Sequence, residues 1–271
     1  NYASSGTKIL EVLGEEHMRD KSLILYTSSD SVLQIAAHEE IIPLKELYRI
    51  CDIAREVCMK PEYFVGRIIA RPFLGKDKHS FYRVTGDRHD IAVSPSNLTA
   101  LDVLKENKIL TLGIGKIGDI FNQQGISKSI KSKNNEDGMN ITINELKSNP
   151  NIGLYFVNLV EFDSEYGHRR NAPGYKKCIE DFDKQLLTFV NNMKNDDLLI
   201  ITADHGNDPT MPGSDHTREM VPFIAYSPLI KNGKKLETRN SFADIGETVL
   251  TNFSLKKKDH MLGTSIKELF E

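Results

Sequence analysis

Residues Leu198–Glu219, "LLIITADHGNDPTMPGSDHTRE", decide which fold class the chain belongs to. An apolar run of strand length opens the stretch, and two Asp-His pairs follow it, Asp204-His205 and Asp215-His216. The Gly and Pro residues between the pairs predict a loop rather than a longer strand. Titratable side chains directly after a buried strand are typical of the carboxyl edge of a parallel sheet, where α/β proteins bind their ligands.

The rest of the second half alternates strands with helices. Apolar runs predict strands at 109–115 and 151–163, and helical periodicity predicts helices at 98–108, 140–149, 174–194 and 241–253. This alternation indicates an α/β core with a mostly parallel sheet flanked by helices. The helix at 174–194 is amphipathic. Its apolar face is expected to carry Ile179, Phe182, Leu186, Val190 and Met193.

The first half has a different texture. A strand is predicted within 22–30, a helix at 42–58, and two further strands at 64–73 and 81–93 with a polar loop between them. We therefore expect an α+β domain at residues 1–95 and the α/β core domain at residues 96–271.

The composition indicates a soluble globular protein, because 39% of the 271 residues are hydrophobic and 27% are charged. The net charge of −3 argues against a nucleic-acid partner, which usually calls for a basic excess. No apolar run approaches the roughly 18–20 residues of a membrane span, so no membrane partner is expected. The cysteines Cys51, Cys58 and Cys178 form no CxxC motif, and we interpret them as reduced thiols of a cytoplasmic protein, the first two packed in the core.

Two predicted strand ends each deliver one Asp and one His. Asp204 and His205 follow one strand, and Asp163 and His168 follow the other. A parallel sheet would hold these ends side by side. The spacing of five between Asp163 and His168 does not match one face of an α-helix, so we expect a loop that curls back with the help of Gly167.

His216 can return to the same point after the loop that contains Pro and Gly. Carboxylate oxygens combined with imidazole nitrogens suit Mn, Zn or Fe(II) better than Ca. Five candidate ligands exceed the three protein ligands of an ordinary catalytic zinc, which indicates two metal ions, as in many phosphoryl-transfer sites. Any one of these residues alone would more often be a helix cap or a hydrogen-bonded loop residue. Two such sets on successive strand ends favour the metal site.

Two segments carry a resemblance to a known family. Residues 202–228, "TADHGNDPTMPGSDHTREMVPFIAYSP", and 158–175, "NLVEFDSEYGHRRNAPGY", resemble the metal-binding segments of the phosphopentomutase family, in the alkaline phosphatase superfamily. Residues 28–57, 65–73 and 242–253 are also similar, so the resemblance extends over essentially the whole chain. "TADHG" alone is shared with cofactor-independent phosphoglycerate mutases, whereas "FDSEYGHRR" together with "DHTREMVP" is much more specific.

The resemblance implies a fold, a reaction and a metal set. The fold would be an alkaline-phosphatase-like α/β core with an inserted cap, and residues 1–95 would be that cap. The family interconverts ribose 1-phosphate and ribose 5-phosphate, and the deoxyribose equivalents, by metal-assisted phosphoryl transfer with two Mn ions. One ion would be held by Asp163, His168 and His216. The other would be held in part by Asp204 and His205.

The resemblance also implies substrate-binding residues in the cap. Ser28 and Asp30 match positions that face the sugar, and Arg67 and Arg83 match arginines that bind phosphate. A guanidinium group suits that role because it can donate two parallel hydrogen bonds to a phosphate and keeps its charge at any pH. Without the family match, each arginine would be interpreted as a solvated residue or a surface ion pair.

Four other residues are weaker candidates. Arg88 and His89 are interpreted as structural, and Asp215 as a support for the metal loop. Lys116, which follows the predicted strand at 109–115, is as consistent with a solvated lysine as with a substrate contact.

The family has an N-terminal segment that supplies an Asp to the second metal and the threonine that carries the phosphoryl group, and neither has a counterpart in this sequence. Thr202, Thr210 and Thr217 do not match the motif of that threonine. No catalytic nucleophile is therefore identified. We expect the chain to be one piece of the enzyme, inactive alone, with a separate N-terminal segment as its partner.

Two alternatives stay open. A related phosphoglycerate mutase or phosphatase would use the same metals, although the cap segments favour a phosphopentomutase. A non-catalytic module that binds phosphosugar and metal would explain the unmatched nucleophile. Turnover of different phosphate esters, compared with binding of ribose 5-phosphate, separates these readings.

Overall fold

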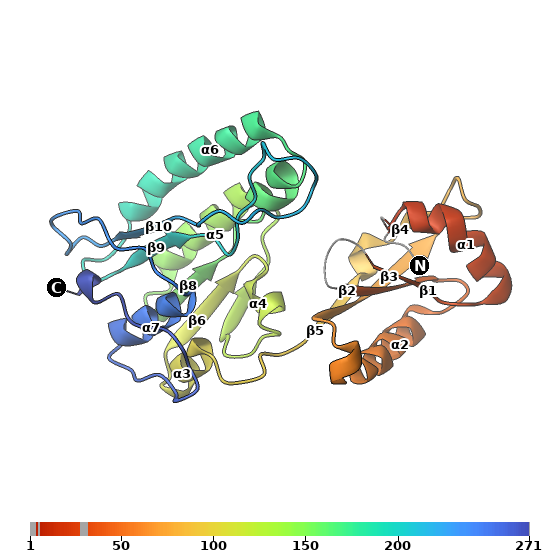
Figure 1. The fold of residues 1–271 in the computed structure, drawn as a ribbon, viewed down its shortest axis with the longest axis horizontal. Helices are drawn as coiled ribbons and strands as arrows, with labels where there is room; N and C mark the ends of the chain where they lie inside the picture. The colour runs from red at the N-terminus through yellow and green to blue at the C-terminus, as the bar shows by residue number, and fades with distance from the viewer. Residues whose placement is uncertain (1–3, 5, 28–31, 271) are drawn as a thin grey trace. The chain divides into compact units, whose positions relative to one another are not determined.

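The computed structural model describes residue 4 and residues 6–27 and 32–270. The chain divides into two compact units, Asn1–Ser94 and Pro95–Glu271, and each is described by itself (Figure 1). Both units mix helices with sheet, and the second contains a parallel sheet with helices packed on it. The α/β class predicted from the sequence is confirmed.

The first unit is built on one sheet with strand order β1–β2–β3–β4, in which β5 also pairs with β3. Strands β2 and β3 are parallel and are connected through α2, whereas the other pairs are antiparallel. The strands are β1 (Ile24–Tyr26), β2 (Val32–His38), β3 (Arg67–Leu74), β4 (Tyr82–Arg83) and β5 (His89–Ala92). The helices are α1 (Lys8–Asp20) and α2 (Leu44–Val57), with 3-10 turns η1 (Pro61–Tyr63) and η2 (Thr85–Asp87).

The two helices bury opposite faces of this sheet. Because side chains alternate along a strand, neighbouring residues of β2 and β3 enter different cores. On the side of α2, Leu47 and Cys51 pack with Ile35 and Ile68. The core on the side of α1 contains Ile9, Leu10, Ile24, Tyr26, Ala36 and Phe73.

Helix α1 was not predicted from the sequence. Its apolar residues Ile9, Leu10 and Leu13 recur at helical spacing, but the helix is polar on average and carries Gly14 in its middle. Gly14 is required by packing, since a Cβ atom there would lie 2.3 Å from the ring of Phe81. The glycine that weakens the helical pattern in the sequence is thus what lets α1 approach the Phe81 ring.

The second unit contains a parallel sheet in the order β7–β6–β8. A separate antiparallel pair is formed by β9 and β10. The strands are β6 (Leu110–Ile114), β7 (Lys128–Ile130), β8 (Ile152–Val157), β9 (Leu199–Thr202) and β10 (Phe223–Tyr226). The helices are α3 (Ala100–Glu106), α4 (Ile117–Ile120), α5 (Asn135–Ser148), α6 (Ala172–Val190) and α7 (Ala243–Asn252), with the π-helix η3 (Phe162–Gly167) and the 3-10 turn η4 (Lys267–Leu269).

The pairing of β9 differs from the expectation. We predicted that one sheet would hold the ends of β8 and β9 side by side. Within the described residues, β9 is hydrogen-bonded to β10, and β8 to β6. The two metal-ligand segments therefore follow strands of different sheets, and contacts made by the loops must bring them together.

Helix α6 packs on α5, and of the five residues predicted on its apolar face all but Ile179 are half-buried. Ile179 itself is 50% exposed, so the residue expected on this face is not buried. Cys178 lies on the inner side instead, where its sulfur accepts a hydrogen bond from Asn135 Nδ2 at 3.2 Å. Phe182 and Leu186 are half-buried, as the periodicity predicts.

The three cysteines are free thiols, as predicted. Cys51 and Cys58 both belong to the core between α2 and the sheet. Burial raises the pKa of Cys51 to about 12, so this thiol stays protonated at neutral pH.

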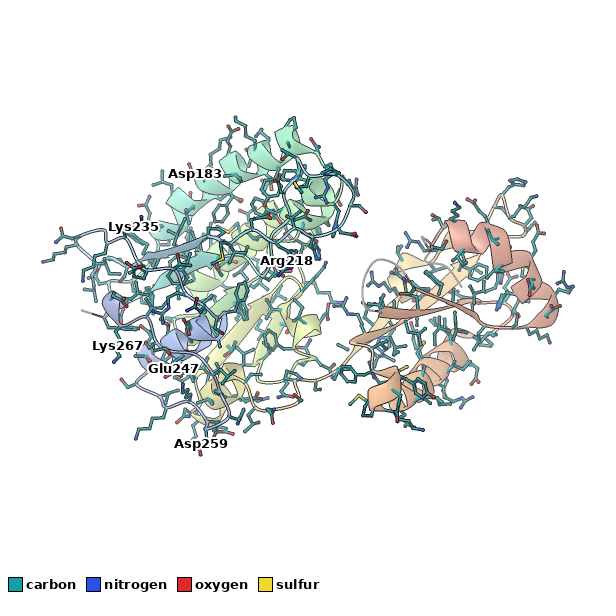
Figure 2. All side chains as sticks on the ribbon, in the orientation of Figure 1. Asp183, Arg218, Lys235, Glu247, Asp259 and Lys267 are labelled. Atoms are coloured by element: carbon teal, nitrogen blue, oxygen red, sulfur yellow. The ribbon has the colours of Figure 1, made fainter. Side chains whose placement is uncertain are left out.

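Charged side chains lie on the outside of the second unit. Asp183, Lys235 and Lys267 all extend away from the body of this unit (Figure 2). Across the described ranges, we find no helix with the length and apolarity needed to cross a bilayer.

Phe73 tests the core of the first unit. Its side chain is fully buried and its ring lies 5.3 Å from the rings of Phe81 and His38. We expect Phe73→Ala to cost about 3–5 kcal/mol of unfolding free energy, because it leaves a cavity in a close-packed core. Urea unfolding monitored by circular dichroism measures this cost. Phe64→Ala is the matched control, since Phe64 is 55% exposed, and equal losses for the two variants would contradict the assignment.

Candidate metal centre

A π-helical turn places Asp163 and His168 on the same side of η3. The backbone N–H of His168 donates to the carbonyl of Asp163 at 2.9 Å, which is the i to i+5 hydrogen bond of a π-helix. A spacing of five residues, which would separate the two side chains on an α-helix, aligns them here. The predicted proximity therefore comes from a regular turn rather than from the irregular loop that we expected.

Three ligand-type atoms converge at this turn. His168 Nε2 lies 3.3 Å from Asp163 Oδ1, and His216 Nε2 lies 3.3 Å from the same oxygen. The two imidazole nitrogens are 3.1 Å apart. The three atoms form a nearly equilateral triangle of one carboxylate oxygen and two nitrogens.

The size of this triangle fits a metal ion. Ligand atoms about 2.0–2.2 Å from a tetrahedrally coordinated ion lie roughly 3.3–3.6 Å from one another. The separations of 3.1 and 3.3 Å are close to that range. The donor types, one carboxylate and two imidazoles, suit Mn, Zn or Fe(II).

The orientation of His168 is fixed from behind. Its Nδ1–H donates to the carbonyl of Ser214 at 2.5 Å, which leaves the Nε2 lone pair facing Asp163 and His216. A ligating histidine is usually held in this way through its other ring nitrogen. Asp215, which was expected to support the loop, contributes its backbone carbonyl, and its side chain is exposed.

The predicted second pair lies at the edge of this group. The ring of His205 stacks on that of His216 with centroids 3.8 Å apart, and one ligand atom each of Asp163, His205 and His216 lies within 4.8 Å of the others. Asp204 is more remote, since its side chain is 72% exposed and its carboxylate is 3.7 Å from His205 Nε2. The structure brings four predicted ligands together and leaves Asp204 at the surface beside them.

Arg170 joins the two metal-ligand segments, although the sequence analysis gave it no role. Its guanidinium donates to the carbonyl of Gly167 in η3 and to several groups of the loop that carries His216. The loop acceptors are the carbonyls of Gly213, Asp208 and Asp215 and the side-chain oxygen of Asn207, at 2.5 to 2.9 Å. The Arg170 side chain thus anchors this loop to the π-helix η3 by hydrogen bonds. Its place in the "GHRR" motif was visible in the sequence, but its partners were not.

Asn207 continues this connection to the metal ligands. Its Nδ2 donates to Asp163 Oδ1 at 2.7 Å, while its own oxygen accepts from Arg170. The side chain is 7% exposed. Gly167 makes room for it, because a Cβ atom there would lie 2.5 Å from Asn207 Nδ2. The glycine expected to help the chain turn instead permits a close contact.

The loop is closed at its base by a single β-bridge between Gly206 and Thr217. The Thr217 hydroxyl accepts from the backbone N–H of Asp208 at 2.7 Å and donates to Glu219. Hydrogen bonds from the hydroxyl and the backbone of Thr210 lower the pKa of Asp208. The loop between the two Asp-His pairs is thus bonded internally as well as to η3.

The predicted substrate residues belong to the first unit. Arg67 begins β3 and Arg83 ends β4, whereas Ser28 and Asp30 lie outside the described residues. Arg67 Nη1 is 3.6 Å from Asp90. Arg88, interpreted as structural, donates two hydrogen bonds to Asp90 at 2.5 and 2.6 Å. The ring of His89, also interpreted as structural, packs at 5.1 Å from that of Tyr48.

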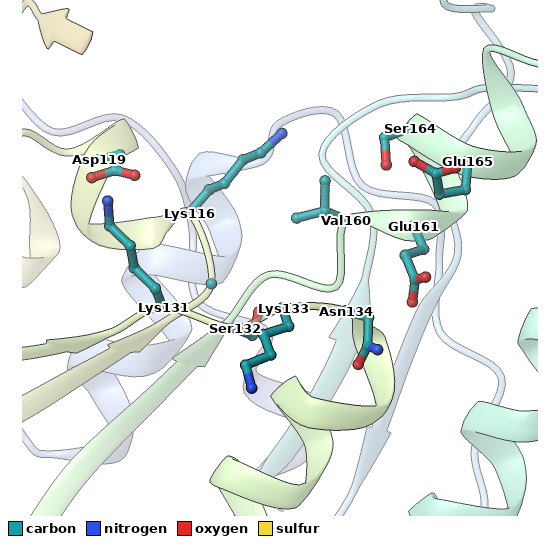
Figure 3. A pocket seen from close by; sticks show the side chains of 11 residues that line it. Lys116, Asp119, Lys131, Ser132, Lys133, Asn134, Val160, Glu161, Ser164 and Glu165 are labelled. Atoms are coloured by element: carbon teal, nitrogen blue, oxygen red, sulfur yellow. The ribbon is translucent and has the colours of Figure 1, made fainter. Parts of the chain in front are cut away.

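Lys116 lines a cavity of about 280 Å³ at the carboxyl ends of β6, β7 and β8 (Figure 3). This is the edge of the parallel sheet where the sequence placed the ligands. Lys131 and Lys133 enter it from the segment after β7, and Glu161 and Glu165 from the segment after β8. Cations and carboxylates are therefore mixed around the cavity, and Lys116 alone does not define a site.

Known proteins resemble this chain over nearly its full length. Residues 15–257 match the model of the family described as the metalloenzyme superfamily. The chain is 53% identical over 268 residues to a phosphopentomutase from Clostridium botulinum, an alignment that covers 99% of this chain and 67% of the relative. Phosphopentomutases from Agathobacter rectalis and Clostridium beijerinckii are 50% and 51% identical, over 99% and 98% of this chain, and again 67% of each relative is covered.

Arg170 allows a direct test of the geometry. We expect Arg170→Lys to weaken Mn²⁺ binding about 10- to 100-fold, the range typical of residues that orient metal ligands, because one ammonium group cannot reach all the acceptors. Isothermal titration of the chain with Mn²⁺ measures the affinity. Arg169→Lys is the control, since Arg169 is exposed and pairs only with Glu165 at 2.9 Å in the described part of the chain. Equal affinities for the two variants would show that the loop needs no such anchor.

Proposed function

The chain belongs to the phosphopentomutase family, within the metalloenzyme superfamily, and from this premise we propose that it interconverts ribose 1-phosphate and ribose 5-phosphate, or their deoxyribose equivalents. The observation that carries the proposal is the triangle of Asp163, His168 and His216 in segments that resemble the family's metal-binding motifs. Metal-assisted phosphoryl transfer is the reaction type that such a site supports.

We propose two Mn ions as cofactors. Asp163, His168 and His216 would hold the first, and Asp204 and His205 would contribute to the second. The short distances among the first three support that grouping. His205 lies close enough to serve a second ion beside the first, since one ligand atom each of Asp163, His205 and His216 lies within 4.8 Å of the others. When bound, the ions would neutralise charge on the transferring phosphoryl group and activate the attacking oxygen.

The protein groups around this site hold the proposed ligands in fixed orientations. Asn207 directs one hydrogen-bond donor at Asp163 Oδ1, so the carboxylate keeps one orientation. The Ser214 carbonyl holds His168 with Nε2 turned inward. In the first unit, Arg67 and Arg83 are proposed to bind the phosphate of the sugar phosphate, with Ser28 and Asp30 facing the sugar. Binding at the phosphate would leave the reacting end of the sugar available for transfer.

The threonine that accepts the phosphoryl group is proposed to come from a separate segment of the enzyme. The threonines near the proposed metal centre support this, because their hydroxyls already donate hydrogen bonds to neighbouring groups. Thr202 donates to the carbonyl of Pro222, Thr210 to Asp208, and Thr217 to Glu219, at 2.7 to 2.8 Å.

A cytoplasmic location also stays a prediction, with which the free thiols agree.

A coupled assay that follows formation of ribose 5-phosphate from ribose 1-phosphate under Mn²⁺ tests the proposal. We expect this activity in the enzyme that contains these residues. Turnover of phosphoglycerate but not of pentose phosphate would replace the proposed substrate. Calorimetric binding of ribose 5-phosphate without turnover under any metal would favour a non-catalytic module.

His168→Ala tests the metal assignment independently of turnover. We expect the variant to lose most of the bound Mn²⁺, because it removes one corner of the triangle. Metal content after dialysis, measured by atomic absorption, reports the loss. His79→Ala serves as the control, since His79 is an exposed residue of the loop between β3 and β4 in the first unit. Retention of Mn²⁺ by His168→Ala at the parent level would remove His168 from the proposed ligands.

A further inference from the structure

One face of the sheet in the first unit carries a concentration of arginines. Strand pairing places Tyr26, Gln34, Ile69 and Asp90 in one row across β1, β2, β3 and β5. Because side chains alternate along a strand, Arg67 and Arg71 point to the same face as Ile69, on either side of it.

Arg83 lies on the same face as this row. It pairs with Phe73, and Phe73 follows Arg71 by two residues on β3. Helix α1 covers the part of the face around Ile24 and Phe73. Arg71 pairs with Ala36 at the border of this covered part and is half-buried.

Among the described residues, the charges around Arg71 do not balance. The arginines there are Arg67, Arg71, Arg83 and Arg88, and the carboxylate among them is Asp90. Arg88 occupies both oxygens of Asp90 with two hydrogen bonds, and Arg67 lies 3.6 Å from the same carboxylate.

Arg71 and Arg83 have no carboxylate within ion-pair distance among the described residues. The local excess of positive charge suits an anionic ligand.

Arg71 is held in a defined orientation. Its Nε donates to Gln34 Oε1 at 2.8 Å, and Gln34 is 3% exposed. With Nε engaged, the two terminal nitrogens of the guanidinium group remain as a fork, which is the geometry that binds a phosphate.

The surroundings make an anionic partner favourable for Arg71. Burial, together with Arg88 and Arg83 nearby, lowers the pKa of Arg71. A guanidinium group stays charged even so, because its ordinary pKa lies far above neutral pH. A half-buried cation next to other cations is stabilised when a dianion binds among them. A merely structural arginine would be expected to have a carboxylate partner, and Asp90 is already taken by Arg88.

We propose that Arg71, positioned by Gln34, is a third arginine that binds the phosphate group of the sugar phosphate, beside Arg67 and Arg83. The inference rests on the proposed function, because it concerns the same substrate. It adds a binding residue and a positioning residue that the sequence motifs did not assign.

Titration calorimetry of the chain with ribose 5-phosphate tests the inference. We expect Arg71→Gln to weaken binding about 10- to 100-fold, the range for hydrogen bonds between charged groups. Gln34→Met, which removes the acceptor and keeps the charge of Arg71, should weaken it several-fold. Both variants should bind Mn²⁺ as tightly as the parent.

Arg49→Gln is the matched control, because it removes the same charge from α2, which packs on the opposite face of the sheet, and leaves the arginine cluster intact. Parent-like binding of ribose 5-phosphate by Arg71→Gln would overturn the inference and leave the proposed function standing. Failure of the parent itself to bind ribose 5-phosphate would instead remove the sugar-phosphate site altogether.

Circular dichroism shows whether each variant is folded. If Arg71→Gln does not fold, Arg71→Lys replaces it, since lysine keeps the charge but lacks the rigid planar fork that holds Gln34 and a phosphate in fixed directions. Weakened binding by the lysine variant supports the inference, and unchanged binding contradicts it.

Discussion

The set of hydrogen bonds made by Arg170 is the interaction on which the arrangement of the proposed metal ligands depends. Asp163 and His168 come from the π-helix after β8, and His216 comes from a loop after β9, a strand of another sheet. Pairing between the two strands does not hold these segments together in the described structure. The guanidinium of Arg170 does so by bonding to both segments, and Asn207 carries the connection to Asp163. An arginine suits this position because its planar group offers five donors in fixed directions.

In the first unit, the main constraint is that the two faces of one sheet lie in different environments. Helix α2 covers one face with apolar contacts, and α1 covers a part of the other. What α1 leaves uncovered on that face carries arginines and a buried glutamine. On β3, Phe73 therefore packs in the core under α1, whereas Arg71, two residues earlier on the same face, carries a positive charge.

Several features could be predicted from the sequence because they depend on local patterns. Alternating apolar runs predicted β6, β8 and β9 and the helices α3, α5, α6 and α7, whereas β7, β10 and the short α4 were not predicted. The predicted strand ends and the loop after β9 gave Asp163, His168, His205 and His216 as candidate ligands. Predictions failed where spacing alone had to decide geometry. Five residues between Asp163 and His168 indicated a loop, yet the chain forms a π-helical turn. On α6, Ile179 was expected to be buried, yet it is half-exposed, and Cys178 and Gln185 bond to α5 instead.

The sequence by itself determined the fold class, the family and the kinds of ligand atoms at the proposed metal centre, because these follow from residue types and short-range order. The tertiary structure decided which donors meet, through Arg170, Asn207 and the close approach at Gly167. It also decided that Arg71 shares a sheet face with Arg67 and Arg83, which are matched to phosphate binding. The physical reason is that such contacts join residues far apart in the chain, and their distances are set by packing rather than by any local periodicity.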